Sequence, residues 1–278
     1  MNLSSIITLA NKRVELRFLA MVRSLRAVGC QLPVKVIPYD DSRFELPEGC
    51  SWLENGELFT FLSRHRTHPT MRKYLCLLES NYQFVDADIC FLRNPERVLS
   101  NESGFITCCG HWRNVAHAVN DLVAEYLRTK STNWQRRTFN SGQFACDRSL
   151  YTVESLLTKL SDPWVGDSCL RWRFNEQPGL NLLVNLTNVP IVNLTLPPME
   201  LESSWAGDYL ENYESFWTDE KRKPYILHWA GLDMRQTRPI DKIFFGFLKG
   251  EELHRWQNEM PIRRESFLGK VCKVFASR

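Results

Sequence analysis

Apolar residues recur along this chain at two spacings, and their alternation predicts an α/β fold. Residues 4–9 form a short apolar run typical of a buried strand. Residues 14–28 then place apolar side chains every three or four positions, as on one face of a helix, and residues 34–38 form a second strand. A strand, a helix and a strand in succession favour a parallel sheet with crossover helices.

The same alternation continues through most of the chain. We expect further strands at 82–85, 105–109, 143–146, 190–194 and 225–227, and helices over 71–78, 115–126, 150–160 and 177–184. Residues 196–223, with paired prolines, predict a long irregular excursion of the kind that often covers a site. Because no internal repeat or linker interrupts the pattern, we expect one domain over residues 1–260.

The final residues, 261–278, have the pattern of a basic amphipathic helix. Phe267, Leu268, Val271, Val274 and Phe275 fall on one helical face, and arginines and lysines are available for the rest of the surface. Such a helix commonly docks onto its own domain with its charges in water. The alternative is peripheral contact with an anionic membrane surface.

Composition narrows the class of protein. The 278 residues are 44% hydrophobic and 24% charged, and the net charge of +3 argues against general nucleic-acid binding. The nine cysteines contain no C-x-x-C pair, which favours buried thiols in a reducing cytosol over disulfides or zinc. No apolar stretch approaches the ~18 residues that span a bilayer, and no secretory signal is evident. We therefore expect a cytoplasmic protein.

The clearest chemical signal is Asp86-Ala87-Asp88, which interrupts an apolar run at the C-terminal end of a predicted strand. Two carboxylates this close, in an apolar setting, do not both stay ionised unless a cation joins them. Hard oxygen ligands favour Mg²⁺ or Mn²⁺. The alternative is an acidic turn in which one carboxylate caps a helix.

His228 is the second signal, because it directly follows an apolar strand and precedes a turn at Gly231. Its ring is expected in the same crevice, where a neutral imidazole is a good third ligand for a divalent metal and favours Mn²⁺ over Mg²⁺. The alternative is an ordinary hydrogen-bonded histidine.

Two more polar segments have both a functional and a structural interpretation. Asn140, in the segment F-N-S-G, could contact a sugar or phosphate or could belong to a turn. Glu176 and Gln177 precede Pro178, so they could face a sugar or could start a helix.

The order of these segments resembles that of the GT-A-fold glycosyltransferases, particularly the family-eight-like enzymes that use nucleotide-diphosphate sugars. An apolar strand ending in D-x-D is followed by F-N-S-G, then E-Q-x-x-L-N, then H-W-A-G, and the segment 71–75 looks like the helix before the metal strand. The resemblance covers roughly residues 4–240. It implies a Rossmann-like fold with a mixed, mainly parallel sheet flanked by helices.

The resemblance also implies an activity: metal-dependent transfer of a sugar from a nucleotide-diphosphate donor, with a UDP-sugar expected, to an acceptor. The metal, Mn²⁺ or Mg²⁺, would bridge the donor diphosphate and be held by Asp86, Asp88 and His228. Glu176 and Gln177 would lie beside the anomeric carbon as catalytic groups. Glu176 stands where the family-eight enzymes carry Asp.

Further residues would bind the donor. The resemblance assigns this role to Thr8, Leu9, Ala10 and Asn11 at the nucleotide, Arg72 and Asn140 at the sugar or phosphate, Ala87 between the aspartates, and Arg235, or else Arg238, over the phosphates. The first strand lacks the acidic residue that many relatives place at its end.

Two other interpretations stay open. A haloacid dehalogenase-type phosphatase also places D-x-D after an apolar strand, although Cys90 stands where that motif has Thr or Val. A catalytically inactive nucleotide- or carbohydrate-binding protein is the third interpretation, since the nine tryptophans permit stacking on sugar faces.

Overall fold

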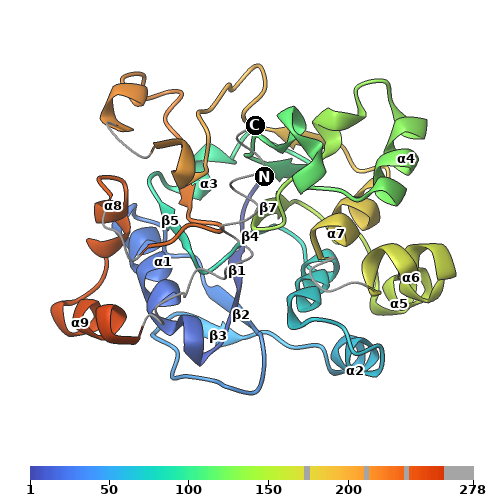
Figure 1. Cartoon of the computed structure of the whole chain (residues 1–278), viewed down its shortest axis with the longest axis horizontal. Helices are drawn as coiled ribbons and strands as arrows, with labels where there is room; N and C mark the ends of the chain where they lie inside the picture. The colour runs from blue at the N-terminus through green and yellow to red at the C-terminus, as the bar shows by residue number, and fades with distance from the viewer. Residues whose placement is uncertain (172–175, 210–212, 235–237, 260–278) are drawn as a thin grey trace, which may run out of the picture.

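A seven-stranded mixed sheet runs through the centre of this computed structural model, which describes residues 1–171, 176–209, 213–234 and 238–259 (Figure 1). Its strands lie in the order β3 (Cys50–Trp52), β2 (Val34–Pro38), β1 (Ser5–Ala10), β4 (Tyr82–Val85), β7 (Gln143–Cys146), β6 (Phe105–Thr107), β8 (Ile191–Asn193). The strand β7 is antiparallel to both of its neighbours, and the other pairs are parallel. The expected mixed, mainly parallel α/β sheet is confirmed.

Helices cover both faces of this sheet (Figure 1). On one side lie α1 (Glu15–Ala27), α8 (Asp241–Phe245) and α9 (Gly250–Glu259). On the other lie α2 (Gly56–Arg64), η2 (Pro69–Leu78), α4 (Asp121–Lys130), α5 (Val153–Ser161), α6 (Pro163–Cys169) and α7 (Glu176–Asn185). Because neighbouring side chains of a strand point to opposite faces, Phe84 packs into one core and Val85 into the other. Both faces are buried, as the nearly continuous apolar strands predict.

Two predicted helices differ from the structure. The segment 71–78 belongs to η2, a 3₁₀ helix rather than an α-helix. The single helix predicted over 115–126 is wrong: a 3₁₀ turn, η4 (Val115–His117), is followed by a separate helix, α4. The side chain of Asn120 accepts a hydrogen bond from the backbone N–H of Val123, which starts α4 at Asp121. Apolar spacing alone does not reveal such a cap.

A second, two-stranded sheet pairs β5 (Ile89–Phe91) with β9 (Ile226–His228). The strands are antiparallel, and Ile89 lies opposite His228. This pairing was not predicted, because the apolar run after Asp88 is short. It joins the segment after the aspartates to the strand that ends in the histidine.

The segment 196–223 is the long excursion that was expected. Its described part contains only short 3₁₀ turns, η6 (Ala206–Tyr209) and η7 (Tyr213–Phe216). In the ranges that the structure describes, no helix is both long and apolar enough to cross a membrane. Arg235 and the predicted helix over 261–278 lie outside those ranges.

Candidate active site

Asp86, Asp88 and His228 converge at the C-terminal end of β4. Nε2 of His228 lies 3.2 Å from Oδ1 of Asp88 and 3.8 Å from Oδ2 of Asp86. One potential ligand atom from each of the three residues lies within 4.8 Å of the others. Backbone hydrogen bonds hold the arrangement, because Asp86 N donates to Gly142 O at 2.7 Å and Trp229 N donates to Asp88 O at 3.0 Å.

Gly142 lets the backbone of the neighbouring turn approach these three side chains. A Cβ atom at this position would lie 2.2 Å from Cε1 of His228 and 2.7 Å from Oδ2 of Asp86. It would also lie 2.7 Å from Oδ1 of Asn140, which accepts a hydrogen bond from the backbone N–H of Gly142. The F-N-S-G segment therefore forms one wall of the cluster, and only glycine fits there.

Lys73, on η2, is part of the same cluster, and the sequence did not single it out. Its side chain is 4% exposed, and Nζ lies 2.9 Å from Oδ1 of Asp86 and 3.9 Å from Oε1 of Glu176. Burial alone would lower the pKa of Lys73, but these two carboxylates raise it above the ordinary lysine value. Lys73 is therefore a buried cation that links a candidate metal ligand to a candidate catalytic residue.

The electrostatics of the cluster favour positive charge between the aspartates. Burial disfavours charge on His228, yet the adjacent Asp88 carboxylate, with Asp86, raises the pKa of His228 above its usual value. Burial likewise opposes ionisation of Asp88, but His228 and then Arg17, whose Nη1 lies 3.6 Å from Oδ2, hold the pKa of Asp88 low. Two carboxylates and an imidazole also form a donor set that suits Mn²⁺ or Mg²⁺, so the residues fit a divalent cation.

Glu176 and Gln177 begin α7 and face the F-N-S-G turn. Oε1 of Gln177 accepts a 2.9 Å hydrogen bond from the backbone N–H of Ser141, and its Nε2 donates to the carbonyl of His117. Glu176 accepts longer hydrogen bonds, both 3.4 Å, from the hydroxyls of Ser141 and Thr70. The structure thus places Glu176 next to Lys73, and both predicted catalytic residues contact Ser141 in the turn that borders the metal-ligand cluster.

The residues expected at the nucleotide lie where β1 and β2 end. Thr8, Leu9 and Ala10 are buried in β1, and Asn11 follows them. Nδ2 of Asn11 donates a 2.7 Å hydrogen bond to Oδ2 of Asp40, which comes two residues after β2. A carboxylate from the end of the neighbouring strand therefore lies beside the end of β1. The sequence did not point to Asp40.

Two other predicted donor-binding residues, Ala87 and Arg72, have different surroundings. Ala87 is buried between the two aspartates. Arg72 donates a 2.6 Å hydrogen bond to the carbonyl of Pro38, and its guanidinium lies over the Phe59 ring. Arg72 therefore lies near the Asn11 end of the site rather than at the aspartates.

Arg238, the alternative to Arg235 over the phosphates, is engaged elsewhere. Its Nε and Nη2 donate 2.8 Å hydrogen bonds to the buried carboxylate of Asp241. That carboxylate also accepts a hydrogen bond from Nε1 of Trp229. Arg238 is thus paired with Asp241, the residue that joins α8 to Trp229.

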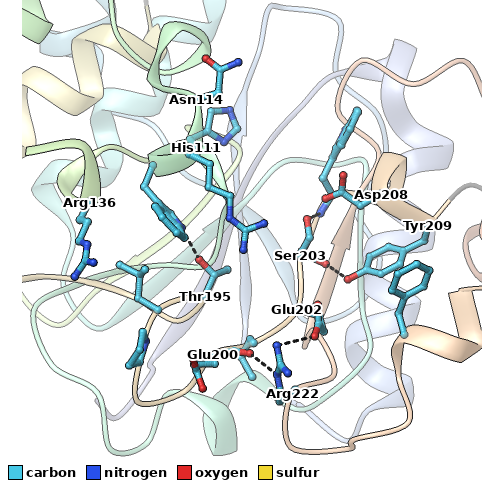
Figure 2. A pocket seen from close by; sticks show the side chains of 18 of the residues that line it. His111, Asn114, Arg136, Thr195, Glu200, Glu202, Ser203, Asp208, Tyr209 and Arg222 are labelled. Carbon is cyan, nitrogen blue, oxygen red and sulfur yellow. Dashed lines mark hydrogen bonds and ion pairs between the residues drawn. The ribbon is translucent and has the colours of Figure 1, made fainter. Parts of the chain in front are cut away.

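A cavity of about 640 Å³ opens beside this cluster, between the segment 110–117 and the excursion 196–223. Figure 2 shows His111, Asn114 and Arg136 on one wall, and Ser203, Asp208 and Tyr209 on the other. Its lining does not include the three metal-ligand candidates. One of the residues that line the cavity, Trp205, pairs through its backbone with His228. Burial, with a smaller contribution from the neighbouring imidazoles, lowers the pKa of His111 to about 4, so this imidazole on the cavity wall is neutral at pH 7.

The fold recurs in solved glycosyltransferase structures. Superposition on the bifunctional glycosyltransferase WbbM gives a TM-score of 0.62 at 13% identity, over 93% of this chain and 52% of that one. The galactosyltransferase LgtC, solved with donor and acceptor sugar analogues, gives 0.56 at 11% identity, over 91% of this chain and 99% of LgtC. GlyE of Streptococcus pneumoniae gives 0.51 at 11% identity, over 93% of this chain and 64% of GlyE. The chain thus spans about half of WbbM and nearly all of LgtC.

These identities establish a shared fold and no more. No protein-family model and no curated protein matches the sequence. What the chain does must therefore be argued from its own residues.

Proposed function

We propose that this chain, which has the GT-A fold, is a metal-dependent glycosyltransferase. It would transfer a sugar from a nucleotide-diphosphate donor, a UDP-sugar, to an acceptor. The observation that carries the proposal is the convergence of Asp86, Asp88 and His228 at a strand end, with no room for a side chain at Gly142. In open α/β sheets, ligands bind beyond the carboxyl ends of the strands. Mixed oxygen and nitrogen ligands favour Mn²⁺.

The roles of the chain's own residues follow from their positions. Asp86, Asp88 and His228 would hold the cation, and Ala87 keeps the two aspartates one residue apart. When bound, a divalent cation supplies positive charge that neutralises the donor diphosphate and stabilises the leaving nucleotide diphosphate. Lys73 balances the carboxylates of Asp86 and Glu176.

Other residues would bind and orient the donor. Asn11 and Asp40 offer amide and carboxylate groups to the nucleotide, beside Thr8, Leu9 and Ala10 at the end of β1. Asn140, whose Oδ1 accepts a hydrogen bond from the backbone N–H of Gly142, would contact the donor sugar. As the bond between the anomeric carbon and the diphosphate oxygen breaks, positive charge develops on the sugar. Glu176 or the amide oxygen of Gln177 would stabilise that charge.

A thermal-shift screen of nucleotides and nucleotide sugars, with and without Mn²⁺, tests this proposal. A donor at ~100 times its dissociation constant should add about 2.7 kcal/mol to the free energy of unfolding. This gain should require Mn²⁺ and should be lost in Asp88→Asn, because a neutral amide is a poor ligand for a hard cation. Donor stabilisation that persists in EDTA and in Asp88→Asn would contradict the metal site. Release of phosphate from p-nitrophenyl phosphate would favour the phosphatase instead.

We further propose that the enzyme works in the reducing cytoplasm, with peripheral membrane contact through residues 261–278. The support for the first point is that the eight described cysteines are all free, seven of them buried. The support for the second is the basic, amphipathic sequence of that segment.

A further inference from the structure

Trp205 is a large aromatic side chain on the cavity wall that is exposed and yet held in place. Its relative exposure is 43%, although tryptophan is usually buried. Nε1 donates a 3.0 Å hydrogen bond to the carbonyl of Ala230. A Cβ at Gly207 would lie 2.4 to 2.6 Å from three atoms of the indole, so one edge or face of the ring rests directly against the Gly207 backbone. The ring is fixed before any ligand arrives.

The position of Trp205 relates it to the candidate metal ligands. Its backbone forms a parallel bridge with that of His228, and the N–H of His228 donates a 2.7 Å hydrogen bond to the carbonyl of Ser204. An exposed ring on this bridge therefore lies in the cavity directly beside the cluster. The second substrate of a transfer reaction must reach the donor from a space of this kind.

Polar groups on the same wall suit a ligand rich in hydroxyls. In the described part of the chain, the Asp208 carboxylate lines the cavity with no hydrogen-bonded or ion-paired partner. It stands on the wall that also carries Ser203 and Tyr209 (Figure 2). A carboxylate can accept hydrogen bonds from two neighbouring hydroxyls. A volume of about 640 Å³ is within the ~300–1,000 Å³ typical of small-molecule sites.

We propose that this cavity binds a saccharide acceptor, with Trp205 stacking on the C–H face of one sugar ring and Asp208 accepting hydrogen bonds from its hydroxyls. The inference rests on the proposed glycosyltransferase function and specifies the chemical class of its acceptor. A sugar has both an apolar face and a polar edge, which matches an aromatic ring next to an unpartnered carboxylate. A lipid chain offers no donor to this exposed carboxylate, whereas sugar hydroxyls can donate hydrogen bonds to it.

Saturation-transfer NMR of the full chain, with lactose, maltose and cellobiose as probes and without donor, tests the proposal. We expect at least one of the three sugars to bind the wild type. Trp205→Ala should weaken that binding roughly tenfold, which corresponds to ~1.4 kcal/mol, whereas Trp205→Phe retains a ring and should keep most of it. Asp208→Asn should weaken binding without removing the ring.

Trp164 provides a matched control, because it is 39% exposed on α6, packs against Tyr126 and does not line the cavity. Trp164→Ala should bind sugar as the wild type does. Thermal melts of each variant identify any that fail to fold. If Trp205→Ala does not fold, sugar binding by Asp208→Asn decides whether the proposal holds.

Absence of binding by all three sugars, or binding that is unchanged in both Trp205→Ala and Asp208→Asn, would overturn the saccharide proposal. Equal losses in Trp164→Ala and Trp205→Ala would do the same. The donor screen on the wild type needs no acceptor, so failure of the glycosyltransferase proposal is recognised separately.

Discussion

Gly142 is the residue at which the backbone comes closest to the candidate metal ligands. We predict that Gly142→Ala folds but loses Mn²⁺-dependent stabilisation by a donor, because the added methyl would overlap the His228 ring and the Asp86 carboxylate. Calorimetric titration with Mn²⁺ measures the effect. Gly56→Ala is the control, because a Cβ at Gly56 meets nothing within 4 Å. Normal Mn²⁺ binding by Gly142→Ala would place the cation elsewhere.

Lys73 leads to a prediction in which cation binding and turnover change in opposite directions. Lys73→Met removes a positive charge whose Nζ lies 2.9 Å from Oδ1 of Asp86. Because like charges repel strongly in a partly buried site, Mn²⁺ should bind several-fold more tightly to the variant. Donor turnover should fall, since Asp86 and Glu176 lose the ammonium that holds them. Titration followed by electron paramagnetic resonance measures the first effect, and nucleotide release measures the second.

A loss of Mn²⁺ affinity in Lys73→Met would show instead that the lysine mainly positions Asp86. Lys35→Met is a suitable control. Lys35 lies on β2, forms an ion pair with Glu79 and is not part of the proposed site. Its Mn²⁺ affinity should match the wild type.

Residues differ in how well the sequence reveals their roles. The convergence of Asp86, Asp88 and His228 could be predicted, because all three are polar residues at the ends of apolar strands, whereas their role as metal ligands stays a prediction. Lys73 could not, since a lysine in a helical segment normally indicates a solvent-exposed face. Asp40 could not be predicted for a different reason. Its partner Asn11 follows β1 whereas Asp40 follows β2, and only the formation of the sheet brings the two residues together.

Among the secondary-structure elements, α9 links the end of the described chain to α1. Nη1 and Nη2 of Arg23 donate to the two carboxylate oxygens of Glu252 at 2.5 and 2.7 Å, and Arg255 donates to Glu15 at 2.6 Å. The helix α1 also carries Arg17, whose guanidinium lies over the Trp256 ring of α9 and near Asp88. The docking of α9 is therefore coupled to the surroundings of a metal-ligand candidate.

The Arg23–Glu252 pair predicts a pH-dependent stability difference. The hydrogen bonds from Arg23 lower the pKa of Glu252 to about 2 from an ordinary value of 4.5. A carboxyl group with a lowered pKa stabilises the fold above its unfolded-state pKa, and this contribution is lost as the pH falls through the folded-state value. Glu252→Gln should therefore cost about 1 kcal/mol at pH 7, a difference that shrinks below pH 4.5 and vanishes near pH 2.

Denaturant unfolding of both proteins across this pH range measures the difference. Glu251→Gln is the control, since the exposed Glu251 has no ion pair within the residues that the structure describes. A difference that is the same at pH 7 and pH 2 would mean that packing of α9, and not the charge, accounts for it.

Elements with long apolar patterns were predicted closely, and those defined by contacts with distant residues were not. The runs at β1, β2 and β4 and the helical spacing of α1 specify these elements locally. The small β5–β9 sheet depends on pairing between two three-residue strands, each too short to show a period of its own. The break before α4 likewise depends on one hydrogen bond, which the side chain of Asn120 accepts from the backbone N–H of Val123.

For the whole molecule, the relation of residues 261–278 to a membrane stays a prediction. Basic residues near an anionic surface contribute about 1 kcal/mol each, so Arg263, Arg264, Lys270 and Lys273 should give attachment that is measurable at low salt and weak at high salt. Flotation with anionic liposomes should recover the full chain but not a version that ends at Met260. Equal recovery of both, or of neither, would contradict the membrane contact, and unfolding of the shortened version would indicate docking onto the domain.

The pairing of β5 with β9 has a consequence for how the protein is made. Asp86 and Asp88 leave the ribosome long before His228 does, and domains fold as their chains emerge. A nascent chain therefore carries both carboxylates of the proposed cation site but cannot close it until β9 has paired with β5. Retention of Mn²⁺ would then distinguish a finished molecule from an incomplete one, so it could serve as a test of chain completion in translation extracts.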